Sequence, residues 1–183
     1  GHDGVFGFAN PVMSLTDIQS RSNIGQLVTN AFIEISFLKN FKFKSSLNGL
    51  LNYNSYKQFV PSTIPGENAP PPRDASETDQ QVNTRNYSAD QLLTYNNSFG
   101  SHRINVLVGY TAQDEKTTTL NAGGTQFPND LTPFLGSAAL KTAGSGEYGW
   151  SLDAFFGRLN YVFAEKYLFS GTFRREGSSR FGE

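Results

Sequence analysis

Side chains suited to catalysis or metal binding are few in this sequence of 183 residues. It has two histidines, His2 and His102, and no cysteine, which excludes thiolate metal sites, disulfides and cysteine nucleophiles. The histidines stand far apart, and neither has a carboxylate at the spacing of a metal site. Neither has the serine or aspartate context that a serine triad would require. We therefore expect neither a metal nor a histidine-dependent active site.

Carboxylates could still hydrolyse a glycosidic bond, which requires two of them facing each other at a fixed separation. Asp90 and Asp153 can be imagined as such a pair, but nothing in the sequence places them together. We interpret both as polar residues of a water-facing surface. The sequence thus predicts a protein that is not an enzyme and needs no cofactor.

Other acidic residues fall in stretches that resemble loops. They lack the patterned spacing of a calcium-binding loop, so we interpret them as solvated loop charges; they are Glu67, Asp74, Glu77, Asp79 and the pair Asn129-Asp130.

Two aromatic residues form the best candidate for ligand binding. Tyr148 and Trp150 flank Gly149 at the end of a long polar stretch, and aromatic faces in loops can stack on sugars. The alternative is that they anchor a strand at a membrane interface, and we favour this alternative.

Composition narrows the class of protein further. Fifteen lysines and arginines against 16 acidic residues leave a net charge of −1, which argues against nucleic acid as a partner. No stretch approaches the roughly 20 apolar residues of a membrane-spanning helix. The 16 Phe, 8 Tyr and 18 Gly instead favour β-structure rich in aromatic residues.

Alternation of apolar and polar residues predicts six strands. Residues 29–37 place Ala31, Ile33, Ile35 and Phe37 on one face, and the pattern restarts after a short turn at Lys39. The same hairpin recurs twice, with turns at Ser101 and Glu165. We expect strands near 24–37, 40–58, 86–99, 103–118, 150–164 and 167–176, which pair as hairpins 24–58, 86–118 and 150–176.

The connections between these hairpins are long and polar, near 60–85 and 119–149, and we predict no regular structure in them. In an antiparallel meander the two long loops must share one end of the sheet and the three turns the other. Short turns at one end and long loops at the other are typical of bacterial outer-membrane barrels.

Charge placement indicates what the apolar face meets. Six charged residues of these strands share one face; they are Glu34, Lys42, Lys44, Asp90, Arg158 and Arg174. The uncharged face fits lipid, with an aromatic girdle beside the short turns formed by Phe37, Phe41, Phe99, Phe163 and Tyr167. Tyr53, Tyr87, Tyr110 and Trp150 would form a second girdle toward the long loops.

The third hairpin and the residues after it carry a long motif. It reads Phe156-Gly157-Arg158-Leu159-Asn160-Tyr161, then Lys166-Tyr167-Leu168, then Arg174-Arg175-Glu176-Gly177-Ser178-Ser179-Arg180-Phe181-Gly182. This motif resembles the barrel of SusC/RagA-like TonB-dependent transporters, in which Glu176 is usually Asp. The similarity runs from about Ala9 to Gly182, through Thr94-Tyr95-Asn96, Ser98-Phe99-Gly100 and Ile104-Asn105.

The resemblance implies an all-β fold, an antiparallel meander of about six strands within a transmembrane barrel of about 22 strands. Residues 1–183 would be part of the barrel wall, without the N-terminal plug. It also implies an outer-membrane location in a Gram-negative bacterium, and import of an oligosaccharide or peptide with a SusD-like lipoprotein and TonB as partners. The alternative is a free-standing soluble or secreted β-sheet module that binds glycans. The substrate itself cannot be read from these residues.

Overall fold

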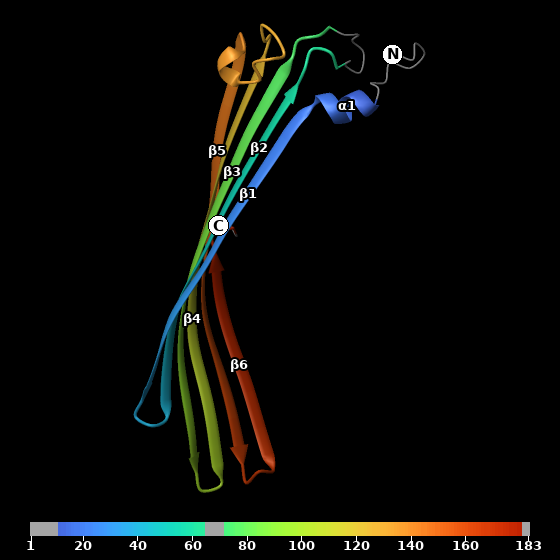
Figure 1. Cartoon of the computed structure of the whole chain (residues 1–183). Helices are drawn as coiled ribbons and strands as arrows, with labels where there is room; N and C mark the ends of the chain where they lie inside the picture. Colours follow the sequence, from blue (N-terminus) through green and yellow to red (C-terminus); the bar gives the residue numbers. More distant parts are fainter. Residues whose placement is uncertain (1–10, 65–71, 181–183) are drawn as a thin grey trace. The chain divides into compact units, whose positions relative to one another are not determined.

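The computed structural model describes residues 11–64 and 72–180, and it forms one antiparallel six-stranded sheet (Figure 1). The strands follow the chain order β1-β2-β3-β4-β5-β6, so each strand pairs with its sequence neighbours. Their bounds are β1 Gln19–Phe37, β2 Phe41–Val60, β3 Ser76–Phe99, β4 His102–Thr125, β5 Leu140–Phe163 and β6 Tyr167–Ser178. A short helix α1 (Pro11–Asp17) precedes β1, and a 3-10 turn η1 (Leu135–Ser137) precedes β5. The predicted six-stranded meander is confirmed.

In the described part of the chain, no helix has the length and apolar character to cross a bilayer.

The chain divides into two compact units. The first comprises residues 1–25, 52–83 and 118–147, and the second comprises 26–51, 84–117 and 148–183. Both long connections belong to the first unit and all three short turns belong to the second. This grouping is the one that the meander predicts.

The strands are longer than the sequence predicted, so the connections are shorter. β3 begins at Ser76, β4 continues to Thr125 and β5 begins at Leu140, which leaves connections 61–75 and 126–139 instead of 60–85 and 119–149. The extra strand residues are rich in Thr, Asn, Gln and Gly and lack alternation. Backbone pairing with neighbouring strands keeps these residues in the sheet, and polar cross-strand bonds such as Thr119 Oγ1 to the carbonyl of Gly146 (3.3 Å) support this pairing.

The short turns rely on left-handed backbone conformations. Leu38 and Lys39 have φ of 49° and 59°, and Ala164 and Glu165 have φ of 52° and 54°. Two consecutive left-handed residues give a turn the twist that matches the flanking strands. Gly100 adopts φ of 55° at no steric cost, whereas the other four residues need the hairpin to hold them there.

The register between β5 and β6 fixes which of their side chains share a face. β5 and β6 pair from Leu152↔Ser178 to Phe163↔Tyr167, which puts Arg158 opposite Thr172 and Arg174 opposite Phe156. On the first strands Glu34 pairs with Lys42 at 2.9 Å, and Lys44 lies 4.7 Å over the ring of Phe32. Asp90 accepts bonds from Asn48 and Thr111 on the neighbouring strands. The predicted charged face is therefore continuous from β1 to β6 in the second unit.

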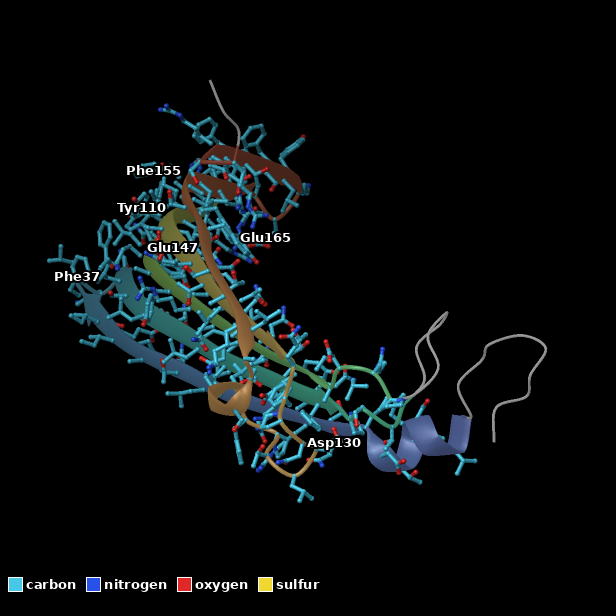
Figure 2. All side chains as sticks on the ribbon, turned by 90° about the horizontal axis from the view of Figure 1, so that it is seen from above. Phe37, Tyr110, Asp130, Glu147, Phe155 and Glu165 are labelled. Atoms are coloured by element: carbon cyan, nitrogen blue, oxygen red, sulfur yellow. The ribbon has the colours of Figure 1, made fainter. Side chains whose placement is uncertain are left out.

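The opposite face carries a row of aromatic rings beside the turns. Neighbouring ring centroids in this row lie 4.7–6.3 Å apart; the pairs are Phe37–Phe41, Phe41–Tyr95, Phe99–His102, His102–Phe163 and Phe163–Tyr167. Farther from the turns, the rings of Tyr110 and Phe155 lie 4.6 Å apart. Figure 2 shows Phe37, Tyr110 and Phe155 along the convex side of the sheet. The rings predicted beside the turns do form a row, which also includes Tyr95 and His102.

Burial differs between the two units. Among the described residues, the buried hydrophobic side chains Phe59, Ile64, Ala75 and Ala138 belong to the first unit, whereas Ala154 is the one such residue in the second. In the second unit large apolar side chains are exposed instead, for example Ile33 (65%), Leu47 (61%) and Phe169 (60%). The apolar face of the second unit is thus uncovered by protein.

Candidate functional site

Trp150 is the centre of a cluster on the charged face. Its indole N–H donates to Glu115 on β4 at 2.9 Å, and Asn86 on β3 donates to the other oxygen of the same carboxylate at 2.9 Å. The guanidinium of Arg180, which follows β6, lies 4.5 Å from the centroid of the Trp150 ring. These contacts join three strands and the segment beyond a fourth, at a distance typical of a cation–π interaction.

This position corrects the prediction that Trp150 belongs to the second aromatic girdle. Because Trp150 faces Glu115, it shares the face of Asp90 and Arg174 and lies opposite the face of Phe155. The prediction failed because Gly149 precedes Trp150 and alternation is weak there, so the face depends on the pairing of β5 with β4.

Glu115 is held as an anion by its neighbours. The hydrogen bond from Asn86 is the larger effect and the one from Trp150 the next, and together they lower the pKa of Glu115. Hydrogen bonds that stabilise the charged form of a carboxylate have this direction.

Tyr148 lies on β5 two residues before Trp150, so both side chains leave the strand on the same face. Its ring is 60% exposed, whereas Trp150 is half-buried beneath its partners. Of the two predicted ligand-binding residues, Tyr148 therefore has the more accessible ring.

Residues of the long motif make contacts between β6 and β5. Within β6, Arg174 donates to Glu176 through Nε at 2.8 Å. The guanidinium of Arg174 also lies 6.0 Å from the centroid of the Phe156 ring on β5. Farther along, Ser179 bonds Ser151 twice, through its N–H to the Ser151 carbonyl (3.0 Å) and through its Oγ from the Ser151 N–H (2.9 Å).

Gly177 is the motif glycine that lies close to a side chain of the neighbouring strand. Gly177 lies opposite Asp153, and a Cβ on Gly177 would lie 2.9 Å from an oxygen of that carboxylate. A Cβ on Gly157 would lie 3.6 Å from the carbonyl of Leu107 on β4, which is an ordinary van der Waals distance. Ser178 accepts a bond from the N–H of Arg180 at 3.3 Å.

Three other motif residues take positions set by alternation. Asn160 donates to Asn105 at 3.2 Å and accepts from Ser170 at 2.9 Å. Arg158 lies on the same face as Asn160, and Arg175, opposite Phe155, lies on the other face.

The sequence analysis missed the role of Gly109. The ring of Phe156 lies directly over it, and a Cβ there would also meet Leu92 at 2.9 Å. The available signal was a glycine inside an otherwise regular strand, which often marks a close approach.

The candidate carboxylate pair is not assembled. Asp90 lies on the charged face with Asn48 and Thr111, whereas Asp153 lies opposite Gly177 and so on the other face. Within residues 11–64 and 72–180, three or more His, Asp or Glu side chains do not gather as a metal site would require. His102 stacks in the aromatic row, while His2 and Glu67 lie outside the described residues.

Two acidic residues predicted to be solvated are instead structural. Glu77 is 2% exposed and forms an ion pair with Lys57, whose ammonium also lies 4.9 Å over the Phe134 ring. Asp130 accepts bonds from the N–H (2.9 Å) and hydroxyl (2.8 Å) of Ser62. The prediction failed because burial of Glu77 depends on the packing of the two connections.

Those connections pack together within the first unit. Phe59, near the end of β2, packs edge to face against Phe127 of the second connection, with ring centroids 5.2 Å apart. Within the second connection, the N–H of Ala139 donates to the carbonyl of Gln126 at 3.2 Å. The Ser62–Asp130 pair joins one connection to the other. Ser62 and Asp130 therefore link the described parts of the two connections within the first unit.

Comparison with curated proteins gives relatives over almost the entire chain. TonB-dependent receptor P3 of Formosa agariphila is 29% identical over 178 residues, which is 95% of this chain and 17% of the receptor. TonB-dependent receptor P26 of the same organism is 25% identical over 195 residues, covering all of this chain and 19% of the receptor. The chain is homologous to TonB-dependent receptors. It spans less than a fifth of the length of these two relatives.

Solved structures show the same fold. The RagAB peptide transporter superposes with a TM-score of 0.79 at 19% identity, covering 90% of this chain and 19% of that chain. The RagAB peptide importer in its "open-open" state gives 0.78 with the same identity. These matches confirm the predicted fold, and the curated relatives confirm the resemblance to TonB-dependent receptors. No family model matches the chain.

Proposed function

We propose that this chain is a wall segment of a TonB-dependent importer in the outer membrane of a Gram-negative bacterium, with its uncharged face against lipid and no catalytic activity. The observation that carries the proposal is that the apolar side chains of this face in the second unit are exposed and form a continuous surface with an aromatic row beside the turns. In water such a surface would be a large exposed apolar patch, which is unfavourable, whereas lipid would cover it.

The extent of the uncharged face matches a bilayer. Counted from the turns, its first charged residues are Arg85 on β3, Asp114 on β4 and Asp153 on β5. These three strands therefore offer about 10 to 14 residues free of charge on this face, close to the 9 to 11 residues that a tilted membrane strand needs.

The charged face fits a water-filled lumen. Asn30 bonds Asn48, which donates to Asp90 at 3.1 Å, and Thr111 donates to the same carboxylate at 2.8 Å. This chain of polar contacts crosses four strands. Lumen-facing side chains of large barrels are polar because water or an internal domain contacts them.

The substrate class we propose is a peptide or an oligosaccharide, captured with a SusD-like lipoprotein and imported with energy from TonB. The resemblance of the motif supports the partners, and the fold shared with a peptide importer supports the cargo. Tyr148, which shares a face with Trp150, is the proposed contact for cargo on the lumen side, because its exposed side chain can stack on a sugar or another side chain.

The test uses the full-length protein in a Gram-negative host. We expect it to require detergent for extraction from the outer membrane, to migrate faster in gels before heating than after, and to support uptake of peptides or oligosaccharides that stops when TonB is removed. A protein that stays soluble without detergent and binds glycans would contradict the proposal and favour the soluble module. If the protein requires detergent and forms a barrel, but uptake of peptides or oligosaccharides continues without TonB, the proposed coupling of uptake to TonB would be contradicted.

A further inference from the structure

Arg85 on β3 and Lys116 on β4 place two positive charges directly opposite each other in the second unit. The register of these strands follows from two side-chain contacts on the charged face, Thr84 with Thr117 at 2.9 Å and Asn86 with Glu115 at 2.9 Å. Arg85 lies between the two β3 members of these contacts, and Lys116 lies between the two β4 members. By alternation both cations are therefore on the uncharged face, close to the end of its charge-free stretch.

This arrangement is unfavourable for the sheet by itself. Like charges directly opposite each other on one face destabilise a strand pair. The side chain of Arg85 is exposed, and within the described part of the chain its guanidinium makes no hydrogen bond or ion pair. Arginines elsewhere in the second unit do have partners, for example Arg103 with Glu165 and Arg174 with Glu176. Arg85 therefore carries a repulsion that no ion pair of its own offsets among the described residues.

One carboxylate shares this face close to the two cations. Asp114 stands two residues before Lys116 on β4 and is exposed, and it forms no ion pair with Arg85. Two cations and one carboxylate leave a net charge of +1 at this place. Such a charge suits a ligand group with a single negative charge better than it suits a polyanion.

Toward the turns, the same face becomes apolar within one residue pair. Tyr87 stands two residues from Arg85 on β3, and its side chain is exposed. On β2, a Cβ on Gly49 would lie 3.5 Å from the Tyr87 ring, so these two residues are neighbours. Leu47, two residues from Gly49 on the same face, is also exposed. A ligand with an anionic head and an apolar tail would find its two complementary surfaces side by side.

We propose that Arg85 and Lys116 bind the phosphate group of a membrane lipid whose acyl chains lie along Tyr87 and Leu47. The inference rests on the proposed function, because this face must meet lipid. A phosphate between the two cations replaces their repulsion with two charge-assisted hydrogen-bonded contacts, and the guanidinium can bind it through two N–H groups. In bacterial barrels the long connections are extracellular, so this lipid belongs to the outer leaflet. A free phosphate would make no use of the apolar residues.

The test measures lipid binding to the full-length protein purified in a neutral detergent. The probes are a phosphorylated, glucosamine-based glycolipid and the same glycolipid after its phosphate groups have been removed. Native mass spectrometry measures the lipid retained during a titration, with inorganic phosphate as a competitor. We expect the phosphorylated glycolipid to bind at least about tenfold more tightly than the dephosphorylated one. Inorganic phosphate at the same concentration should not displace it.

A matched pair of variants tests the assignment to this site. Arg85→Gln removes one of the two cations and should weaken binding of the phosphorylated glycolipid by about tenfold. Arg158→Gln makes the same change at an exposed arginine of the charged face and should leave the affinity unchanged. Equal affinities of the two variants, in proteins that both form barrels, would overturn the assignment.

A charge reversal separates binding from a purely structural role. Arg85→Glu places a carboxylate opposite Lys116, and opposite charges in this position stabilise a strand pair. Without lipid the variant should therefore unfold at the same temperature as the unmodified protein or higher. A ligand that binds the folded state raises the unfolding temperature, so the phosphorylated glycolipid should stabilise the unmodified protein but not Arg85→Glu. Equal stabilisation of both proteins would overturn the proposal.

The same measurements identify the ligand and keep this inference apart from the proposed function. Equal binding of the phosphorylated and dephosphorylated glycolipids would overturn the role of the phosphate. Displacement by inorganic phosphate at the same concentration would overturn a lipid as the occupant. Heat-modifiable migration reports barrel formation separately. A barrel that does not bind the phosphorylated glycolipid contradicts this inference alone, whereas a protein that stays soluble without detergent contradicts the proposed function.

Discussion

Two aromatic side chains on the charged face, Phe156 and Trp150, are each enclosed by residues of neighbouring strands. Gly109 allows the ring of Phe156 to lie against β4, and Arg174 covers that ring from β6. Trp150 is similarly enclosed between Glu115 and Arg180. In both cases an aromatic ring of β5 contacts a residue of β4 and an arginine of β6 or of the segment directly after it.

The Gly109–Phe156 contact gives a prediction at this scale. Gly109→Ala places a methyl group in the space of the Phe156 ring, so the full-length protein should lose about 1–3 kcal/mol of stability. In a Phe156→Ala background the same change should cost much less, giving an interaction free energy of about 1 kcal/mol or more. Urea unfolding of the four proteins in lipid measures this. Additive effects would show that the ring does not constrain Gly109.

At the scale of the strand, β4 separates its two faces residue by residue. Val106, Val108 and Tyr110 alternate with Asn105, Gly109 and Thr111, whose contacts place them on the charged face. Alternation of this kind gives adjacent residues opposite environments at nearly the same depth.

Adjacent residues of β4 therefore provide a matched test of the faces. Val106→Arg should impair barrel assembly, because an arginine facing lipid at the bilayer midplane costs about 2–4 kcal/mol. Leu107→Arg introduces the same side chain one residue later on the charged face and should be milder, since water can reach it. The measurement is the heat-modifiable fraction of the full-length protein. Equal damage from the two variants would contradict the assignment of faces.

The two connections 61–75 and 126–139 give a second prediction at this scale. Asp130→Ala removes both bonds to Ser62, and hydrogen bonds to charged groups contribute about 1.5–3 kcal/mol when they are well protected. We expect faster proteolytic cleavage between residues 61 and 75, by about tenfold if about 1.4 kcal/mol is lost. Leu131→Ala, at a side chain that is 88% exposed, is the control. Similar cleavage rates for both variants would show that the Asp130 bonds do not hold the connection.

At the scale of the whole molecule, the two units differ in how far their apolar side chains are buried by protein. The first unit buries Phe59, Ile64 and Ala138 between strands and connections, as a soluble protein does. The second unit exposes Leu47, Val108 and Phe169 on a sheet face without a covering layer. A sheet with one uncovered apolar face requires a second layer or lipid.

Cysteine scanning tests where the bilayer boundary lies along β4. The chain has no native cysteine, so single cysteines can be placed along the uncharged face of β4. In a full-length protein freed of other accessible cysteines, we expect Val108→Cys and Ala112→Cys to resist a membrane-impermeant thiol reagent in intact membranes. Asp114→Cys and Leu120→Cys should react. Uniform reactivity along the strand would contradict a bilayer boundary between Ala112 and Asp114.

The amino-acid sequence alone determined the strands next to the turns, their two faces and the family resemblance. A residue's face follows from a period of two, which is a local property, and charge on one face only is visible without any structure. The tertiary structure decided the true ends of β3, β4 and β5, where both faces are polar and alternation disappears. It also decided that Trp150 faces Glu115, that Glu77 is buried, and that Arg85 lies opposite Lys116. These features depend on the register between strands and on the packing of distant connections, which are set by contacts far apart in the sequence.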